Sequence, residues 1–481
     1  MSKQFNIEDF LAFEIKYKLF TRKYKNLHYW AYIRFILYYE IYREKHSIGP
    51  NQSSIFNYTK LQKIFIVIKN IGWALIRNPF LYKGKRELLI FNQQRRVMLG
   101  REYVDPLFDT WVKQEKSFSY VMLEDNHLGT HFPVSDKNNL LYLDYFILLR
   151  KIVRSFLRVN TTNLANEICD LIESEFYVKI NKKQLSFKLD SLYVENQYLR
   201  ALYKKLLVRY MPRALLINCY YNFTKMIFIE LAHEMKIPVI EFQHGSMGKE
   251  HLAYNYPEDI RINSFPDYIF VWAKFWKDIT RFPIEKDKVI VTGYPFFEQR
   301  IIDEKEKLNK KTNIKPVILF ISQGTIGKDL SKIAVELFSM EKENYDIIYK
   351  LHPGEYHQWR KKYPWLVSSG IKVIDNSNKD IYQFFSEIDI QIGVYSTALF
   401  EGLGFDLLTI IVQLPFSSLM EDAYQQGYVL KAKDCFDIVE ILKSQQRKKK
   451  FTENKFWEPD SVNKITESLH VILNNQNDNQ S

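Results

Sequence analysis

Apolar and polar positions follow two different patterns along the chain, and the change lies near residue 86. Upstream, residues 7–80 carry apolar side chains at steps of three and four, which predicts helices. The first apolar stripe consists of Phe10, Phe13, Tyr17, Phe20, Tyr24 and Leu27. Downstream, short apolar runs alternate with helical stretches, and this alternation predicts parallel sheets covered by helices on both faces.

The short apolar runs predict the strands of two successive α/β units. In the first unit we expect strands at 88–91, 120–123, 214–217 and 238–242, with 144–209 mostly helical. In the second unit we expect strands at 268–272, 289–292, 316–322, 346–351, 371–374, 389–394 and 408–412. The predicted fold class is α/β, with two Rossmann-like domains facing a cleft and a helical N-terminal extension.

Domain boundaries are expected where these patterns change. Residues 1–80 form the helical extension, 81–265 the first Rossmann-like domain and 266–458 the second. Residues 459–481 are expected to form a final helix, to residue 473, and a disordered tail.

Composition narrows the class of protein without choosing a function. The 481 residues carry a net charge of +12, which suits nucleic acid, an anionic membrane surface or phosphorylated substrates. No secretory signal is visible, and the most apolar stretch, 64–76, is interrupted by Lys69 and too short to span a bilayer. The three cysteines are far apart, so neither a disulfide framework nor a zinc site is expected. We expect a cytoplasmic protein.

The N-terminal helices have two interpretations. Their aromatic stripe and the basic residues around it are typical of a helical subdomain packed on the main body, which is the interpretation we favour. They would also suit a surface that rests on an anionic bilayer, and both can hold at once.

Polar residues at predicted strand ends are the candidates for chemistry, because ligands of parallel sheets bind beyond the carboxyl ends of the strands. His244 follows the strand 238–242. In the second unit, a loop containing Gly324 and Thr325 precedes a helix and could cradle an anion, although its spacing fails the P-loop pattern. Ser396 and Thr397 stand at a predicted helix start, where backbone N–H groups and hydroxyls can hold phosphate.

An ordered set of short motifs carries a resemblance to a known family. These motifs are QHG at 243–245, GYP at 293–295, KLHPGEY at 350–356 and GVYSTALFEG at 393–402. Over about residues 210–430 they resemble the bacterial capsule and surface-polysaccharide glycosyltransferases of the GT-B fold. They are similar, more distantly, to the CDP-glycerol glycerophosphotransferases of teichoic acid synthesis. The His-Pro and Ser/Thr pair also resembles the CMP site of bacterial sialyltransferases.

This resemblance implies that the second domain binds the nucleotide donor. His352 would bind the donor phosphate with Lys350 nearby. Ser396 and Thr397 would hold phosphate oxygens, and Glu401 would face the ribose or base. The donor, CMP- or UDP-linked, is a substrate, and no further cofactor is expected.

The resemblance also implies that the first domain holds the acceptor. His244 would act there as the general base, since the ordinary pKa of imidazole lies near working pH. Glu124 and Asp125, at another strand end, are rival bases. Removing the hydroxyl proton as the acceptor attacks the anomeric carbon gives inversion, and retention stays open. No Asp-x-Asp pair occurs at a strand end, so we expect no metal and a leaving phosphate held by helix dipoles and side chains.

The sequence therefore predicts a glycosyltransferase that adds sugar to a lipid-linked capsule or other surface polysaccharide. It would work peripherally on the inner face of the plasma membrane. Polyol-phosphate transfer from a CDP-polyol is the alternative on the same fold. The sequence assigns neither a CMP-sugar nor a CDP-polyol as donor, because Gln243 departs from the glycerophosphotransferase pattern and Asn126 from the sialyltransferase one. A non-catalytic scaffold and a nucleic-acid-binding protein are alternatives of another class, and no nucleic-acid motif is present.

Overall fold

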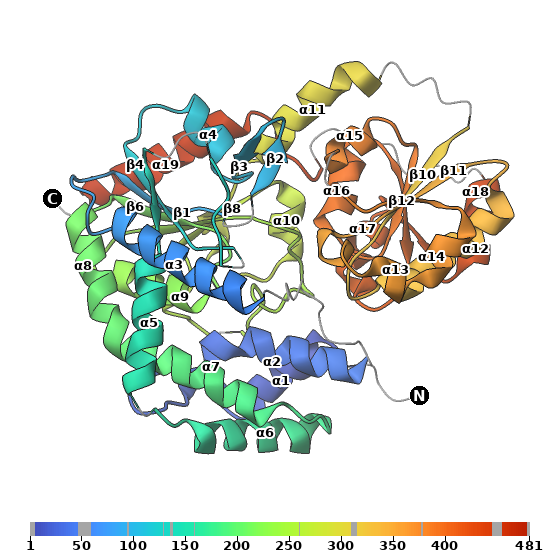
Figure 1. Ribbon diagram of the computed structural model, residues 1–481. Helices are drawn as coiled ribbons and strands as arrows, with labels where there is room; N and C mark the ends of the chain where they lie inside the picture. Colours follow the sequence, from blue (N-terminus) through green and yellow to red (C-terminus); the bar gives the residue numbers. More distant parts are fainter. Residues whose placement is uncertain are drawn as a thin grey trace.

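Two parallel sheets, each flanked by helices, form two domains that lie side by side in a computed structural model (Figure 1). The structure describes residues 5–46, 59–93, 96–127, 129–134, 138–157, 159–258, 260–308, 315–376, 379–444 and 455–478. This is the two-domain α/β architecture that the sequence predicts.

The first sheet has seven parallel strands in the order β5-β4-β1-β6-β7-β8-β9. Their bounds are β1 Leu88–Phe91, β4 Tyr120–Glu124, β5 Leu140–Tyr142, β6 Ala214–Ile217, β7 Val239–Phe242, β8 Tyr268–Val271 and β9 Val289–Val291. The central strands are apolar runs because helices bury both of their faces. A small hairpin, β2 Val97–Leu99 and β3 Glu102–Val104, follows β1.

The helices of the first domain connect these strands. They are α4 Asp109–Gln114, α5 Asp144–Phe156, α6 Thr162–Phe176, α7 Lys182–Val194, α8 Arg200–Tyr210, α9 Phe223–Glu234 and α10 Lys274–Ile279. A π-helical turn, Glu195–Leu199, joins α7 to α8. The predicted helical region 144–209 is thus confirmed.

The second sheet has six parallel strands in the order β12-β11-β10-β13-β14-β15. Their bounds are β10 Val317–Ile321, β11 Asp346–Lys350, β12 Lys372–Ile374, β13 Ile390–Gly393, β14 Leu408–Val412 and β15 Leu430–Ala432. The helices are α12 Gly327–Glu341, α13 Trp359–Lys362, α14 Pro364–Ser369, α15 Ile381–Phe385, α16 Thr397–Gly404, α17 Glu421–Gln425 and α18 Cys435–Lys443.

The predicted domain boundary after residue 265 is wrong. Strands β8 and β9 lie in the first sheet, where β8 pairs with β7 and β9 pairs with β8. The chain leaves the first domain through α11 (Pro295–Leu308) and returns to it in α19 (Ser461–Asp478), drawn in red in Figure 1. Strand-helix alternation is the same in both domains, so the sequence pattern does not reveal which sheet a strand joins.

The two chain segments that connect the domains, one before α11 and one before α19, pack against each other. Gly293 has a φ of +82°, and a Cβ there would lie 2.2 Å from the Glu458 carbonyl oxygen. The rings of Phe297 and Trp457 are 3.9 Å apart, and the Ser461 N–H donates to the Glu298 carboxylate at 3.0 Å. The GYP motif therefore belongs to the first of these segments and not to a strand end of the second sheet. Helix α19 also continues five residues beyond its predicted end at residue 473.

The N-terminal helices α1 (Ile7–Lys16) and α2 (Trp30–Lys45) pack on the first domain. Phe10 and Phe13 of the aromatic stripe are buried, which confirms the packed interpretation. Arg34 of α2 pairs with Glu14 of α1 at 2.6 Å and donates to the Leu252 carbonyl at 2.7 Å, so the helices hold the long loop after β7. Helix α2 also reaches the second domain, where Tyr42 stacks on Phe416.

Candidate functional site

The carboxyl ends of β7 and β13 meet between the domains. Strand β7 runs into Gln243, His244 and Gly245, and the buried Gln243 fixes this turn. Its side chain donates to the Gly245 carbonyl at 2.9 Å and accepts from the Trp272 N–H at 2.8 Å. The next N–H, of Ser246, donates to the Thr397 hydroxyl of the second domain at 3.2 Å. The structure thus brings the His244 loop to the start of α16.

His244 is enclosed by aromatic hydroxyls, with its side chain 16% exposed. Its Nε2 lies 3.2 Å from the Tyr221 hydroxyl and its Nδ1 lies 3.5 Å from the Tyr254 hydroxyl. The Tyr254 O–H donates to Glu241 at 2.7 Å, so the Tyr254 oxygen accepts from His244. This places the proton on Nδ1, so the lone pair on Nε2 accepts from the Tyr221 O–H.

A buried carboxyl group, Glu241, lies beneath His244. Its Oε1 is 3.8 Å from His244 Nδ1, and its Oε2 is buried with no hydrogen-bond partner in the described part of the chain. Burial raises the pKa of Glu241 to about 7, against the hydrogen bonds from Tyr254 and the Tyr220 N–H. Burial, helped by the charges of His251 and Lys225, lowers the pKa of His244 to about 3. His244 is therefore a neutral imidazole at neutral pH.

In the second domain, Ser396 caps α16. Its hydroxyl accepts from the Ala398 N–H at 3.2 Å, as predicted for a helix N-cap. The neighbouring Tyr395 hydroxyl hydrogen-bonds to Thr325, which follows β10. Ser396, Thr397 and Thr325 are thus brought together at the carboxyl edge of the second sheet.

The loop after β11 lies next to the loop after β10. His352 caps a short 3₁₀ turn, Pro353–Glu355, by accepting from the Gly354 N–H through Nδ1 at 3.1 Å. This bond places the His352 ring proton on Nε2. Glu355 accepts from the His352 N–H at 2.8 Å and lies against Gly324. His352, Gly324 and Thr325 therefore occupy adjoining loops.

Lys350 and Glu401 both lie against α15. The Lys350 ammonium group is 5.6 Å from the Phe384 ring, and burial lowers its pKa against the opposing charge of Asp380. Glu401 is 8% exposed and accepts from the Tyr382 O–H at 2.8 Å. Burial raises the pKa of Glu401 to about 7. A contact of either residue with a nucleotide stays a prediction.

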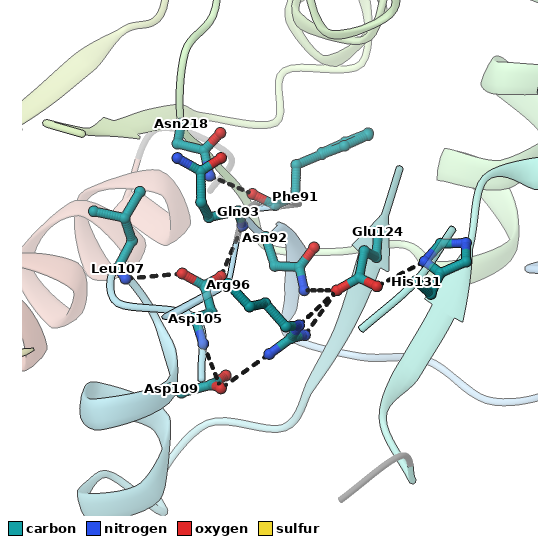
Figure 2. Close-up of polar contacts among 10 residues, drawn as sticks. All are labelled: Phe91, Asn92, Gln93, Arg96, Asp105, Leu107, Asp109, Glu124, His131 and Asn218. Carbon is teal, nitrogen blue, oxygen red and sulfur yellow. Dashed lines mark hydrogen bonds and ion pairs between the residues drawn. The ribbon is translucent and has the colours of Figure 1, made fainter. Parts of the chain in front are cut away.

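The rival base Glu124 is held inside a buried network, shown in Figure 2. Arg96 donates to it at 2.8 Å, Asn92 at 2.9 Å, and His131 Nδ1 lies 2.7 Å from its other oxygen. Burial acts to raise the Glu124 pKa, but the His131 hydrogen bond and the Arg96 charge outweigh it and lower that pKa. With both oxygens paired, Glu124 is poorly suited to accept a substrate proton.

The network extends on both sides of Glu124. Arg96 also pairs with Asp109 at 3.1 Å, and His131 Nε2 lies 2.7 Å from Asp144. Asp125, the other rival base, is half-buried next to this network. Burial raises its pKa, against the charge of Arg150. Within the described residues, Asp125 makes no hydrogen bond to His244, so these two candidate bases do not form one constellation.

Sequence reasoning missed Glu241 and its tyrosine partners. A signal for Glu241 existed, because it is an acidic residue in the middle of the apolar strand Val-Ile-Glu-Phe. Tyr221 and Tyr254 lie on loops, and their convergence on His244 depends on the tertiary fold. The ring of His251 lies 5.8 Å from that of Tyr221, and its Nδ1 is buried with no hydrogen-bond partner among the described residues.

Comparisons with known proteins identify the fold. Neither models of known protein families nor curated sequences match the chain. Among solved structures, UDP-GlcNAc 2-epimerase from Methanocaldococcus jannaschii has a TM-score of 0.50 at 12% identity, covering 80% of this chain and 99% of that one. The same enzyme from Neisseria meningitidis, bound to UDP-GlcNAc, has a TM-score of 0.47 at 14% identity, covering 80% and 99%. The wall teichoic acid polymerase TagF has 0.42 at 12% identity, covering 87% and 99%.

At 12% identity, the likeness to the Methanocaldococcus jannaschii enzyme establishes architecture and leaves the reaction to be argued from the site. The chain has the two-domain α/β fold of the GT-B type, with a helical N-terminal extension packed on its first domain.

Proposed function

We propose that the protein is a glycosyltransferase that moves a sugar from a nucleotide donor to a lipid-linked surface polysaccharide, without a metal. One observation carries this proposal: His244 of the first domain stands next to the start of α16 of the second, joined by the Ser246–Thr397 hydrogen bond. A base for a hydroxyl and a helix start for a phosphate are thereby adjacent.

In the proposed reaction, each domain supplies one half of the chemistry. The acceptor hydroxyl takes the place of the Tyr221 hydroxyl at Nε2 of His244 and gives its proton to this nitrogen as its oxygen attacks the anomeric carbon. The bond to the donor phosphate breaks with inversion. The leaving phosphate takes up negative charge beside the N–H groups of α16 and the hydroxyls of Ser396 and Thr397. His352, with its ring proton on Nε2, is the further donor to that phosphate.

Nucleotide binding is the first test. Calorimetric titration of the full chain with CMP, CDP, UDP, GDP and TDP should find one nucleotide that binds more tightly than the others. We expect Thr397→Val and His352→Ala to weaken that binding about tenfold or more, since each removes a hydrogen bond to a charged group. His28→Ala, an exposed histidine ahead of α2, is the matched control and should bind normally. If no nucleotide binds, the donor site is wrongly assigned.

The second test separates transfer from binding. His244→Gln should keep nucleotide affinity and lose transfer from the matching nucleotide sugar, because the amide cannot take up a proton. Turnover of CDP-glycerol or CDP-ribitol, with no turnover of nucleotide sugars, would instead assign polyol-phosphate transfer to the same site. Unchanged transfer in His244→Gln would refute its role as base.

A further inference from the structure

The helix α3 (Lys60–Ile76) exposes its apolar face to solvent. Eight of its large apolar side chains are exposed, namely Leu61, Ile64, Phe65, Val67, Ile68, Ile71, Leu75 and Ile76. Leu61 is 79% and Phe65 68% exposed, whereas a helix packed on a globular domain normally turns such residues inward. Contiguous apolar surface of this kind marks a site of interaction.

The opposite face of α3 fixes the helix on the first domain. Trp73 packs edge-on against His131 with ring centroids 4.7 Å apart, and Ala74 is buried. A Cβ on Gly129 would lie 3.2 Å from the Ile66 side chain. Since His131 binds Glu124 at the end of β4, α3 lies over the carboxyl edge of the first sheet. Figure 1 shows it in blue along the front of that domain.

Charge around α3 indicates what covers its apolar face. Residues 59–86 contain seven basic residues and no acidic one: Lys60, Lys63, Lys69, Arg77, Lys83, Lys85 and Arg86. An apolar helix face bordered by Lys and Arg is typical of helices that lie in the interface of an anionic bilayer. No helix in the described part of the chain is long and apolar enough to cross a membrane. At 17 residues, α3 suits a helix lying in the plane of the interface.

We infer that α3 is a monotopic membrane anchor, with its exposed face buried in the acyl region of an anionic leaflet and Lys60 and Lys69 at the headgroups. Within the predicted helical extension, this inference places the membrane surface on α3, because Phe10 and Phe13 of the aromatic stripe are used for packing. The inference goes beyond the proposed function and draws on it in one respect: a lipid-linked acceptor would enter beside α3, next to the carboxyl edge of the first sheet.

Vesicle binding of the full chain tests the anchor without any substrate. The protein should sediment with vesicles made of equal parts phosphatidylglycerol and phosphatidylcholine, and less with phosphatidylcholine alone. The double variant Ile64→Glu/Ile68→Glu should lower the partition coefficient at least about tenfold, because it loses apolar contact and adds charge repelled by the leaflet. Both side chains are more than half exposed, so the fold should tolerate the change.

The matched control places the same charges on comparable exposed residues elsewhere. Ile302→Glu/Val471→Glu changes residues of α11 and α19 that are 58% and 59% exposed, and should bind vesicles like the wild type. Absence of vesicle binding by the wild type, or equal binding by both double variants, overturns the inference. A wild-type dimer in gel filtration that the α3 variant alone dissociates overturns it too, since a second copy would then cover α3. Failure of nucleotide binding leaves this test unaffected.

Discussion

The Glu241→Gln substitution tests how the buried carboxyl group controls His244. Glu241 has a pKa of about 7 and lies 3.8 Å from His244 Nδ1, so it becomes charged next to the imidazole as pH rises through 7. At an effective dielectric constant of about 20, two unit charges at that distance attract by about 4 kcal/mol. Ionised Glu241 would therefore raise the proton affinity of His244 about a thousandfold. Glutamine keeps the shape and removes the charge.

Two measurements follow from this coupling. Glu241→Gln removes this gain in the proton affinity of His244. If the proposed function is right and half of that gain, in free energy, is felt in the transition state, the variant should transfer about thirtyfold more slowly than the wild type above pH 8. It should also remove the rise in rate near pH 7. Without any substrate, NMR of labelled histidine should show the His244 signal shifting near pH 7 in the wild type and staying constant in the variant.

The pH dependence of stability provides a third measurement on the Glu241 carboxyl group. The folded-state pKa of Glu241 exceeds its ordinary value of 4.5, so the folded protein holds this proton more tightly than the unfolded chain. The free energy of unfolding should therefore fall by about 3 kcal/mol as pH rises from 4.5 to 7, and Glu241→Gln should abolish that part of the fall. Denaturant titrations at several pH values measure it.

A matched substitution at Glu401 separates the effect of coupling to His244 from the effect of burying a carboxyl group. Glu401 is also buried with a pKa of about 7, but it bonds to Tyr382 in the second domain. Glu401→Gln should also abolish part of the fall in the free energy of unfolding as pH rises. It should leave the shift of the His244 signal near pH 7 as it is in the wild type. A His244 signal that still shifts near pH 7 in Glu241→Gln would refute the coupling.

The remaining predictions concern stability, measured by denaturant unfolding. Arg34→Met leaves the buried Glu14 carboxylate without its ion pair and should cost about 3–5 kcal/mol, whereas Arg281→Met, whose partner is exposed, should cost about 0.5 kcal/mol or less. Gly293→Ala combines a positive φ with a clash against a backbone carbonyl and should cost about 3 kcal/mol. Gly370→Ala has a similar φ of +81° in open space and should cost only about 1 kcal/mol; equal losses at both glycines would contradict the clash.

Apolar runs predicted the strands well because buried parallel strands need continuous apolar sequence. The runs at 88–91 and 214–217 match β1 and β6 residue for residue. The allocation of β8 and β9 to a sheet could not be predicted, since it depends on which strand β7 pairs with across space. The cap role of Ser396 followed from local sequence, whereas the burial of Glu401 depends on α15 packing over it.

The orientation of α3 lay outside what periodicity can reveal. Its apolar positions repeat at helical spacing, and that pattern does not distinguish a face turned to the core from one turned to solvent. Only the small inner face around Trp73, packed on His131, shows which side is covered.

The return of the chain into the first domain affects how the protein is made. Ile465 and Leu469 of α19 are fully buried in the first domain, yet they are translated after the whole second sheet. During synthesis, the second domain can fold while the first still exposes the surface that α19 will cover. The first domain therefore completes its folding last, although its strands leave the ribosome first, and a nascent chain stalled before residue 461 would depend on chaperones to keep that surface covered.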